Sequence, residues 1–374
     1  MVEWKKLGEI EDAGVLTLGR GQVISKKDMR DCPGEYPVYS SSSQGDGEIG
    51  RYGRYMFDDE RITWSIDGGG KLFYRNHLKY SVTNVCGWLR VNKAEIINTR
   101  FLYYLLFNQW SNIEFNYNHK AHPSIIRNEY LIPIIPLSEQ TRIVGILDTF
   151  TASIDNLKEQ IAERRKQYEY YRDQLLDLEG KEGAEMKTLG EVCLKTKNIK
   201  WKSEPEENSY FYIDLSSVNI DLNNITDTTE INKDSAPSRA QQIVKIDDIL
   251  LGTTRPTLKR YCQVPMQYDN QICSTGYCVF RANTAIVLSR WIFHNIGNGR
   301  FWDYCEQKQQ GAGYPCLSNS DAFAYIIPVP SLSEQQRIVS ILDTFEASIQ
   351  NLEAQLKQRQ KQYEYYRNKL LTFD

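Results

Sequence analysis

Two stretches of the chain place hydrophobic residues at alternating steps of three and four. In the first stretch these residues are Ile143, Leu147, Phe150, Ile154, Leu157, Ile161, Tyr168, Tyr171, Leu175 and Leu178, and in the second they are Ile338, Leu342, Phe345, Ile349, Leu352, Leu356, Tyr363, Tyr366, Leu370 and Phe373. This spacing is the a/d seam of a coiled coil and predicts two long helices. Because one helix cannot bury such a seam alone, we expect the two helices to pack on each other.

The two stretches also share their sequence. Residues 137–150 return almost unchanged as residues 332–345, and the run Lys-Gln-Tyr-Glu-Tyr-Tyr-Arg at 166–172 returns at 361–367. A match at one fixed offset indicates a duplicated structural unit. The segments between the copies barely resemble each other, so a constant frame carries two different inserts. Such a frame is suited to recognising two different things at a fixed separation.

Helix start signals and one polar seam position also recur in both copies. Ser138 and Ser333 are predicted N-caps, because a serine hydroxyl can accept an unpaired backbone N–H, and Gln336 would complete a capping box in the second copy. Arg164 and Arg359 interrupt the two seams at the same heptad position, where an arginine can lay its aliphatic stem along the seam. Each helix of about 40 residues would span roughly 60 Å, close to two turns of B-DNA at roughly 34 Å each. A plain dimerisation coiled coil remains the alternative.

A shorter repeat marks where each half begins. The run Trp-Lys-Lys-Leu-Gly-Glu-Ile at 4–10 returns as Met-Lys-Thr-Leu-Gly-Glu-Val at 186–192, and a polar, glycine-bearing linker lies at 179–185. We therefore divide the chain into a first domain, a helix, a second domain and a helix, at residues 1–137, 138–180, 186–332 and 333–374.

Both domains are expected to mix strands with a few helices. The predicted strands are 61–66 and 80–91 in the first domain and 243–246, 248–251 and 275–280 in the second, and the predicted helices are 99–110 and 288–302. The fold class is thus α+β, with two mixed α/β domains joined to two long helices.

Composition limits the choice of function. The chain has 374 residues, of which 41% are hydrophobic and 25% charged, which are ordinary globular values. No apolar run approaches the ~20 residues of a membrane span, and the first residues lack an apolar signal core, so we expect a cytoplasmic protein. The eight scattered cysteines then predict reduced thiols. With a net charge of −3, any basic surface must be local.

The frame resembles the specificity subunit of type I restriction–modification systems. The residues that carry the resemblance are the Ile-Pro-x-x-x-Leu-Ser-Glu-Gln-x-Arg-Ile-Val-x-Ile-Leu-Asp phrase before each helix and the Lys-x-Leu-Gly-Glu start of each half. The resemblance implies two target-recognition domains, each touching one half of a split double-stranded DNA sequence. It implies that the helices pack antiparallel within the chain, with pseudo-two-fold symmetry, and measure the spacer between the half-sites. It also implies that the helices dock two methyltransferase subunits, which use S-adenosylmethionine, and that restriction motor subunits can join them.

The sequence offers no convincing catalytic or cofactor site of its own. It contains neither the Asn/Asp-Pro-Pro-aromatic run of amino-methyltransferases nor a phosphate-binding P-loop. The one G-x-G-x-x-G, at 45–50, lies among turn and strand residues instead of between a strand and a helix. His119 and His122 lack further ligands that would complete a metal site. We therefore expect a non-enzymatic subunit that binds neither metal nor cofactor.

Polar loops supply the candidate DNA contacts, since bases and phosphates are contacted by Arg, Lys, Gln, Ser and Thr. These candidates are Ser42, Gln44, Arg51, Arg54, Lys71, Arg75 and Lys120 in the first domain and Thr254, Arg255, Lys259, Arg260 and Gln309 in the second. The candidate partner-binding residues lie at the helix starts and are Glu139, Gln140, Arg142, Glu334, Gln335 and Arg337.

Because the two domains differ, we expect an asymmetric bipartite target, whereas identical domains on a two-fold frame would bind a palindrome. Two other interpretations stay open. The chain could be a coiled-coil scaffold with two protein-binding heads, or the specificity subunit of a related type II-like methyltransferase–nuclease.

Overall fold

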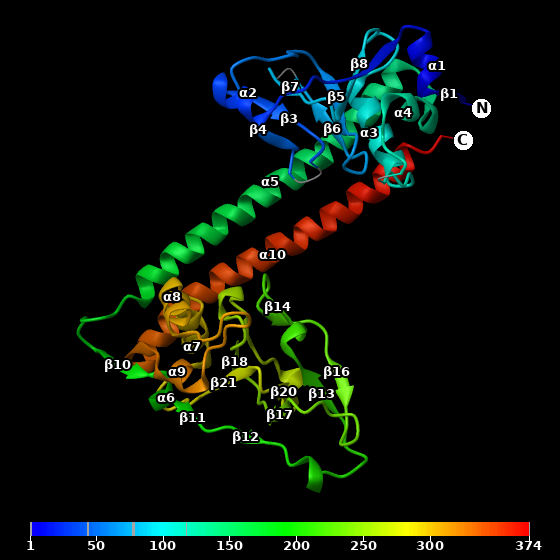
Figure 1. Ribbon diagram of the computed structural model, residues 1–374. Helices are drawn as coiled ribbons and strands as arrows, with labels where there is room; N and C mark the ends of the chain where they lie inside the picture. The colour runs from blue at the N-terminus through cyan, green and yellow to red at the C-terminus, as the bar shows by residue number, and fades with distance from the viewer. Residues whose placement is uncertain (1, 43–44, 77–78, 117, 374) are drawn as a thin grey trace. The chain divides into compact units, whose positions relative to one another are not determined.

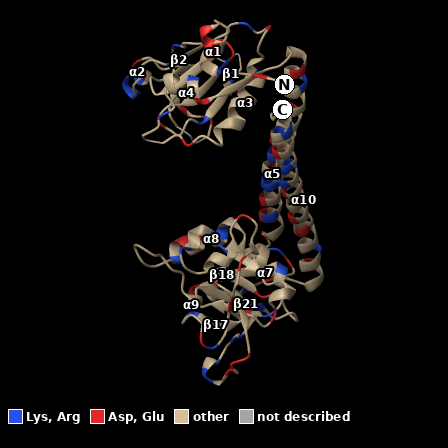
Figure 2. Ribbon diagram, turned by 90° about the vertical axis from the view of Figure 1, so that its right-hand side faces the viewer, with Lys and Arg blue, Asp and Glu red and all other residues tan. Residues whose placement is uncertain are grey.

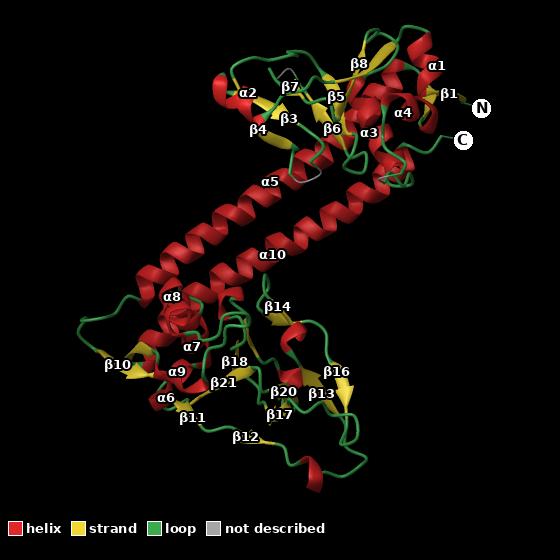
Figure 3. Cartoon of the chain, viewed as in Figure 1, coloured by secondary structure: helices red, strands yellow, loops and turns green. Residues whose placement is uncertain are grey.

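The computed structural model describes residues 2–42, 45–76, 79–116 and 118–373. The chain divides into two compact units. The first unit is Met1–Asn156 with Leu356–Asp374, and the second unit is Leu157–Gln355. Both units combine runs of short strands with a few helices, in agreement with the α+β expectation (Figure 3). Among the described residues, no helix is long and apolar enough to cross a membrane.

The first unit contains most of the elements before the first long helix. They are β1 (Glu3–Lys6), α1 (Leu7–Asp12), β2 (Leu16–Arg20), α2 (Lys26–Asp31), β3 (Tyr36–Tyr39), β4 (Glu48–Tyr52), β5 (Arg61–Ser65), β6 (Leu72–Arg75), β7 (Ser81–Val82), β8 (Cys86–Val91), α3 (Thr99–Trp110), α4 (Pro123–Glu129) and β9 (Leu131–Ile134). The long helix α5 (Leu137–Leu176) starts in this unit, and the last turns of α10 (Leu332–Leu370) return to it.

The second unit holds the elements between the two long helices. They are β10 (Ala184–Thr188), α6 (Leu189–Val192), β11 (Cys193–Leu194), β12 (Lys197–Asn198), η1 (Trp201–Ser203), β13 (Tyr210–Ile213), η2 (Leu215–Ser217), β14 (Val218–Asn219), β15 (Asn224–Ile225), β16 (Thr229–Ile231), β17 (Ala240–Ile243), β18 (Ile249–Gly252), η3 (Pro256–Leu258), β19 (Tyr261–Gln263), η4 (Met266–Tyr268), β20 (Ile272–Ser274), β21 (Tyr277–Ala282), α7 (Ser289–Ile296), α8 (Gly299–Lys308), α9 (Asn319–Ala324) and β22 (Ile326–Pro330).

The two units repeat one plan. Each has an antiparallel four-stranded sheet, in the order β2-β8-β5-β6 in the first unit and β11-β21-β18-β19 in the second. Each also has a two-stranded antiparallel ribbon that precedes a long helix, β1 with β9 and β10 with β22. A further sheet in each unit contains one parallel pair, β3 with β7 and β13 with β20. The duplication seen in the helices therefore extends to the sheets of the domains, although their sequences differ.

A helix packs on each four-stranded sheet and closes its core. Figure 1 shows α3 beside β5 and β6, and α7 beside β18 and β21. Phe101 and Leu105 of α3 are buried in the same cluster as Trp64 of β5, whose indole N–H donates to the Ala121 carbonyl at 2.7 Å. In the second unit Trp291 of α7 is fully buried and donates to the Pro328 carbonyl at 2.8 Å.

Inside each unit, α5 and α10 pack against each other antiparallel. In the first unit Phe150, early in α5, stacks on Tyr366, late in α10, with ring centroids 5.3 Å apart. In the second unit the order reverses, and Tyr171, late in α5, stacks on Phe345, early in α10, at 5.4 Å. The predicted seam is thus confirmed as an intrachain antiparallel coiled coil. Figure 2 shows acidic and basic residues mixed along both helices.

The two seam arginines take the predicted place. The guanidinium of Arg164 lies 5.8 Å from the ring centroid of Phe345, and that of Arg359 lies 5.7 Å from that of Phe150. Both side chains are half-buried. Each arginine therefore adds a cation–π contact to the aromatic stack of its own unit.

The predicted N-caps are wrong by two residues. Helices α5 and α10 begin at Leu137 and Leu332, so Ser138 and Ser333 lie inside the first turn. In α10 the hydroxyl of Ser331 accepts the backbone N–H of Glu334. In α5 the equivalent residue is Pro136, whose carbonyl accepts the backbone N–H of Gln140 at 3.1 Å.

Other predicted elements hold with local changes. The helix expected at 99–110 is α3, with the predicted bounds. The strand expected at 80–91 is interrupted after β7 by a turn, and the helix expected at 288–302 breaks at Gly297, after which the Asn298 side chain caps α8. The strand expected at 243–246 lies earlier, as β17, since residues 244–248 turn toward β18.

Candidate nucleic-acid interface

In each unit the same two loops come together. One is the hairpin turn of the four-stranded sheet, residues 66–71 between β5 and β6 and residues 253–260 between β18 and β19. The other is the loop that follows α3 in the first unit and α8 in the second. In the first unit Trp110 donates its indole N–H to the Gly69 carbonyl at 2.8 Å. In the second unit Thr254 bridges to Cys316. Most of the predicted DNA-binding residues fall on or beside these loops.

The turn of the second unit is held in a strained backbone conformation. Arg255 and Lys259 lie in the left-handed region at φ 50° and 54°, on either side of the short helix η3. Non-glycine residues in this region cost of order 1–3 kcal/mol each, and such strain is often found at functional sites. The corresponding turn of the first unit places glycines, Gly69 and Gly70, at its left-handed positions.

A second loop supports this strained turn. The Arg255 backbone N–H donates to the Pro315 carbonyl at 2.7 Å, and Gln310 pairs with Cys316 within the second loop. The Arg255 guanidinium lies 4.5 Å from the ring centroid of Tyr314. The structure therefore places the turn at 253–260 beside the loop that follows α8, which begins at the candidate residue Gln309.

The residues of this site are not equally accessible. Arg255 and Lys259 are exposed, and Thr254 is partly exposed. Arg260 and Gln309 are half-buried, and the Arg260 Nε and Gln309 Oε1 atoms are buried without a hydrogen-bond partner among the described residues. Arg255, Lys259 and Thr254 are therefore better placed to reach a ligand than Arg260 and Gln309.

In the first unit three predicted stretches meet. The Asp67 backbone N–H donates to the Ser41 hydroxyl, next to Ser42, and the Lys71 ammonium donates to the Gly45 carbonyl at 3.4 Å. The Lys120 ammonium pairs with Asp67 at 2.8 Å. These contacts join residues 40–42 and 45–47, the turn at 66–71 and the loop at 118–121 into one polar surface. Gln44 lies outside the described residues.

Arg75, a predicted DNA contact, is buried. Only 5% of its surface is exposed, and its guanidinium lies 3.4 Å from the ring centroid of Tyr39. It donates to the Asp46 carbonyl at 2.6 Å and to the Thr63 hydroxyl at 3.1 Å. Burial lowers the pKa of the Arg75 guanidinium. Its side chain ties Asp46 to the sheet and is not presented to a DNA ligand.

The two remaining arginines of the first domain lie on or just after β4. Arg51 is exposed, pairs with Glu48 at 3.1 Å and donates to the Glu35 carbonyl. Arg54 is exposed. The last residues of the glycine-rich run at 45–50 are part of β4. A dinucleotide site would require a helix after these glycines, so the run does not form one.

Sequence reasoning missed Tyr314, whose side chain is 71% exposed at the tip of the second loop. The signal was present, since Tyr314 directly follows the Gly-Ala-Gly run at 311–313. Exposed aromatic rings are used to stack on bases in proteins that bind single-stranded nucleic acid, which makes Tyr314 a further candidate contact.

The predicted partner-binding residues divide into two classes. Glu139 with Arg142, and Glu334 with Arg337, form matching surface ion pairs at 2.6 and 2.7 Å. Gln140 and Gln335 are buried and hydrogen-bonded within their own units. The two glutamines therefore have a structural role, which corrects their assignment as partner contacts, while the four charged residues remain available on the surface.

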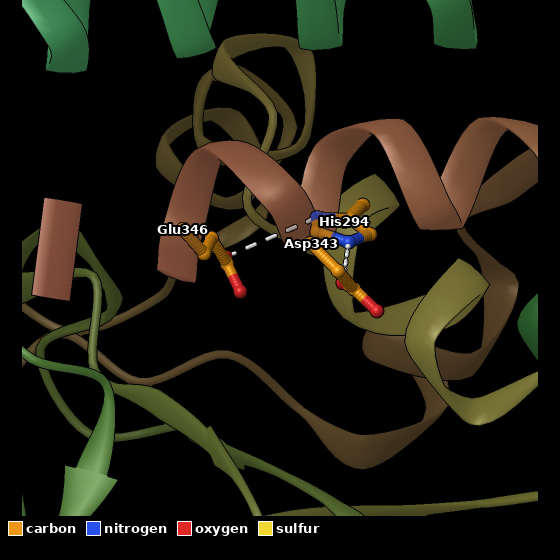
Figure 4. Close-up of side chains that lie close together, drawn as sticks. All are labelled: His294, Asp343 and Glu346. Atoms are coloured by element: carbon orange, nitrogen blue, oxygen red, sulfur yellow. Dashed lines mark hydrogen bonds and ion pairs between the residues drawn. The ribbon is translucent and has the colours of Figure 1, made fainter. Parts of the chain in front are cut away.

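A polar cluster joins α7 to α10 in the second unit. His294 is fully buried, and its Nε2 lies 2.8 Å from Asp343 (Figure 4). His294, Asp343 and Glu346 offer ligand atoms within 4.8 Å of one another, which is the spacing of a metal site. The Arg290 guanidinium, however, already bonds both carboxylates. We therefore interpret the cluster as an ion-pair network.

The first unit has the same junction with different chemistry. Arg100 of α3 donates to Asp148 of α5 at 2.8 Å, as Arg290 donates to Asp343 at 2.9 Å. Tyr104 occupies the place of His294, one turn after the arginine. The arginine–aspartate pair is thus part of the repeated frame, whereas the histidine belongs to the second unit.

Comparison with known proteins identifies the frame. The sequence model of the type I restriction modification DNA specificity domain matches residues 1–164 and again residues 181–361. The chain belongs to this family. Each copy of the family domain covers one recognition region and most of one long helix, in agreement with the repeat in the sequence.

Relatives of this specificity-domain chain are similar along most of its length. A protein of Mycoplasma pneumoniae whose name calls it a type I specificity subunit is 27% identical over 375 aligned positions, covering 96% of both chains. The specificity subunit of a type I restriction enzyme of Escherichia coli is 31% identical over 71% of this chain and 65% of its own length. The crystal structure of the S subunit of a type I restriction–modification system from M. genitalium shares the fold, with a TM-score of 0.67 over 100% of this chain and 96% of that one, at 17% identity.

Proposed function

We propose that this chain is the DNA-recognition subunit of a type I restriction–modification complex and binds an asymmetric, bipartite double-stranded DNA target. The observation that carries the proposal is the repeated frame with unlike loops. Each unit has a hairpin turn and a second loop at the equivalent position of its own four-stranded sheet. These loops differ between the units in sequence and in backbone conformation. Two different loop pairs on one frame would recognise two different half-sites.

Catalysis is assigned to partner subunits. The exposed ion pairs Glu139–Arg142 and Glu334–Arg337 recur with the same geometry on α5 and α10. A surface that occurs twice is suited to docking two copies of one partner, here two methyltransferase subunits that carry S-adenosylmethionine. Restriction motor subunits would complete the complex where the system also cleaves DNA. This chain would hold neither the cofactor nor a catalytic residue, and the complex would act on cytoplasmic DNA.

Single-molecule methylation mapping tests the proposal. A host that expresses this chain with its methyltransferase subunits should acquire methylation at one motif with two unlike halves and an unread spacer. Replacing residues 186–331 with those of a relative should change only one half of the motif. Methylation that follows a palindromic or uninterrupted motif would contradict the proposal.

DNA binding separates this function from a protein scaffold. Binding by the assembled complex should fall steeply as salt rises, because phosphate contacts release counterions. A scaffold with two protein-binding heads would show no such target-specific binding. Omission of the methyltransferase subunits should abolish methyl transfer to the target, whereas a chain that is itself an enzyme would retain it.

A further inference from the structure

The geometry points to Arg255 as a base-recognising residue that selects a guanine in one half of the target. This inference rests on the proposed function and adds to it the identity of one contact and of the base it recognises. Three independent observations support it: the backbone conformation of Arg255, the contact with Tyr314 and the absence of a competing carboxylate.

The backbone at Arg255 is unusual in two respects. Its φ of 50° and ψ of 62° are left-handed, and the next residue is Pro256. Arginine has no steric preference for this region, and a following proline further disfavours a helical conformation. Asparagine or glycine would occupy the position at lower cost. An arginine kept at such a position suggests that its side chain serves a purpose other than folding.

The side chain of Arg255 is also held in place. Its guanidinium lies 4.5 Å from the ring centroid of Tyr314, while its backbone N–H is fixed by Pro315. A guanidinium resting on an aromatic ring keeps its N–H groups free to donate in their own plane. Fixing the side chain before binding reduces the entropy lost when the contact forms.

The charge of Arg255 is not neutralised within the described part of the chain. No carboxylate there pairs with Arg255, whereas Arg51 pairs with Glu48 and Arg281 pairs with Asp248. The guanidinium is therefore exposed, positive and oriented. This combination suits an acceptor-rich partner, and double-stranded DNA offers two kinds, base edges and phosphates.

A planar, oriented guanidinium favours the base edge over the phosphate. Arginine donates two parallel hydrogen bonds to O6 and N7 of guanine in the major groove, and this is the most frequent specific contact between proteins and DNA. Lys259 lies at the other end of the same turn, is equally exposed and also left-handed, at φ 54°. It has no aromatic support among the described residues, and its ammonium is a point charge suited to a phosphate. The turn thus combines one base contact with one backbone contact.

The test compares Arg255→Lys, Arg255→Asn and Lys259→Asn in the complex with its methyltransferase subunits. Asparagine tolerates left-handed backbone, so both Asn variants should fold, and co-purification with the partner subunits checks assembly. Methylation mapping in the host gives the motif of each variant. Competition binding with duplexes that differ from the target by one base pair gives the preference at each position.

Both Arg255 variants should lose the preference for a G·C pair at one position of one half-site, by about tenfold or more, while the other half-site stays unchanged. Lys259→Asn should weaken binding to all duplexes alike and reduce the salt dependence by about one phosphate contact. Tyr314→Phe, which keeps the ring, should retain the motif, and Tyr314→Ala should weaken the same G·C preference.

Two results would overturn the inference. One is an Arg255 variant that weakens binding uniformly at every position, which would make Arg255 a phosphate contact. The other is an unchanged motif and affinity. If a variant complex methylates nothing in the host, the competition binding still decides between these outcomes. A wild-type complex without any bipartite motif would instead reject the proposed function itself.

Discussion

Gln335 holds in the second unit the same set of backbone groups that Gln140 holds in the first. The Gln140 side chain accepts the Asn98 N–H and donates to the carbonyls of Ile96 and Ile135. Gln335 accepts the Leu288 N–H and donates to the carbonyls of Ile286 and Pro330. One side chain thus ties the start of each long helix to the loop before α3 or α7 and to the end of a strand. This tie is common to both units, although the loops it joins differ.

Replacing Gln335 with Ala should destabilise the second unit by about 2–4 kcal/mol, since three partly or fully buried backbone groups would lose their partner. Denaturant unfolding and hydrogen exchange of the α7 peptides would measure the loss. The neighbouring Gln336→Ala is the matched control, because the Gln336 side chain is exposed and donates to the Ser340 hydroxyl on the same helix. Equal effects of the two substitutions would show that the tie is energetically unimportant.

The buried pair of Asp248 with Arg281 should be essential to the sheets of the second unit. Asp248 is 1% exposed and accepts both Arg281 Nε at 2.9 Å and the Lys245 N–H at 2.8 Å. Asp248→Ala would leave a partly buried guanidinium unpaired, so we expect a loss of about 3 kcal/mol in the free energy of unfolding.

The control for this prediction is the exposed ion pair of Glu185 with Lys187. Breaking it by Glu185→Ala should leave the unfolding midpoint of the second unit unchanged, because water replaces the contact. An Asp248→Ala variant as stable as this control would contradict the assignment.

The stability of the second unit should fall on mild acidification because of His294. Burial lowers the pKa of this imidazole below its ordinary 6.5, against the opposing effect of Asp343 and Glu346. Arg290 and the Tyr168 hydroxyl also face the ring. The unfolded chain therefore binds a proton near pH 6.5 that the folded unit resists.

The contribution of His294 to the stability of the second unit is fully present above pH 6.5. It is lost as the pH falls from there toward the lower pKa of the folded state. The pKa of Asp343 is also lowered, so its contribution to stability is present above the ordinary value of 3.8 and is lost only as the pH falls below it. Hydrogen exchange of α7 between pH 7.5 and pH 5.5 should show faster opening at about pH 5.5 than at about pH 7.5, and His294→Gln should flatten this profile. His122→Gln, at an exposed histidine, should not.

The sequence predicted the parts of the fold that periodicity controls. The seams of α5 and α10 and the bounds of α3 follow from the spacing of apolar residues and needed no tertiary information. The N-cap of α10 was misplaced because the sequence has serines at both 331 and 333, and in α5 the position before the helix is Pro136, which has no side-chain acceptor. The role of Gln140 could not be predicted, since two of its three backbone partners, at Ile96 and Asn98, lie more than 40 positions away.

The candidate site was predictable as a set of loops but not residue by residue. Arg75 ends the strand that follows the Gly68-Gly69-Gly70 turn and looks exposed in the sequence, yet Tyr39 of another strand covers it. Arg255 could be chosen as a candidate DNA contact because it lies in a polar loop. Its strained backbone and its contact with Tyr314, however, depend on how two loops meet. The burial and orientation of a polar side chain depend on contacts between segments that are distant in the sequence. They could therefore not be predicted from one sequence.

The antiparallel register makes the ruler hypothesis testable. Because Phe150 faces Tyr366 and Tyr171 faces Phe345, a step forward along α5 corresponds to a step back along α10. Seven residues inserted after Ile161 therefore match seven inserted after Ala354. Such a double insertion keeps the seam in register and lengthens each helix by roughly 10 Å, at about 1.5 Å per residue.

Methylation mapping of the double-insertion variant should show both half-sites unchanged and a spacer longer by about three base pairs, at roughly 3.4 Å each. Inserting five residues in both helices is the control, since five residues turn a helix by about 140° beyond a full turn and move the seam off its partner. That variant should lose bipartite methylation. A spacer that stays fixed in the seven-residue variant would mean that the helices do not set the distance between the half-sites, even though they pack as a coiled coil.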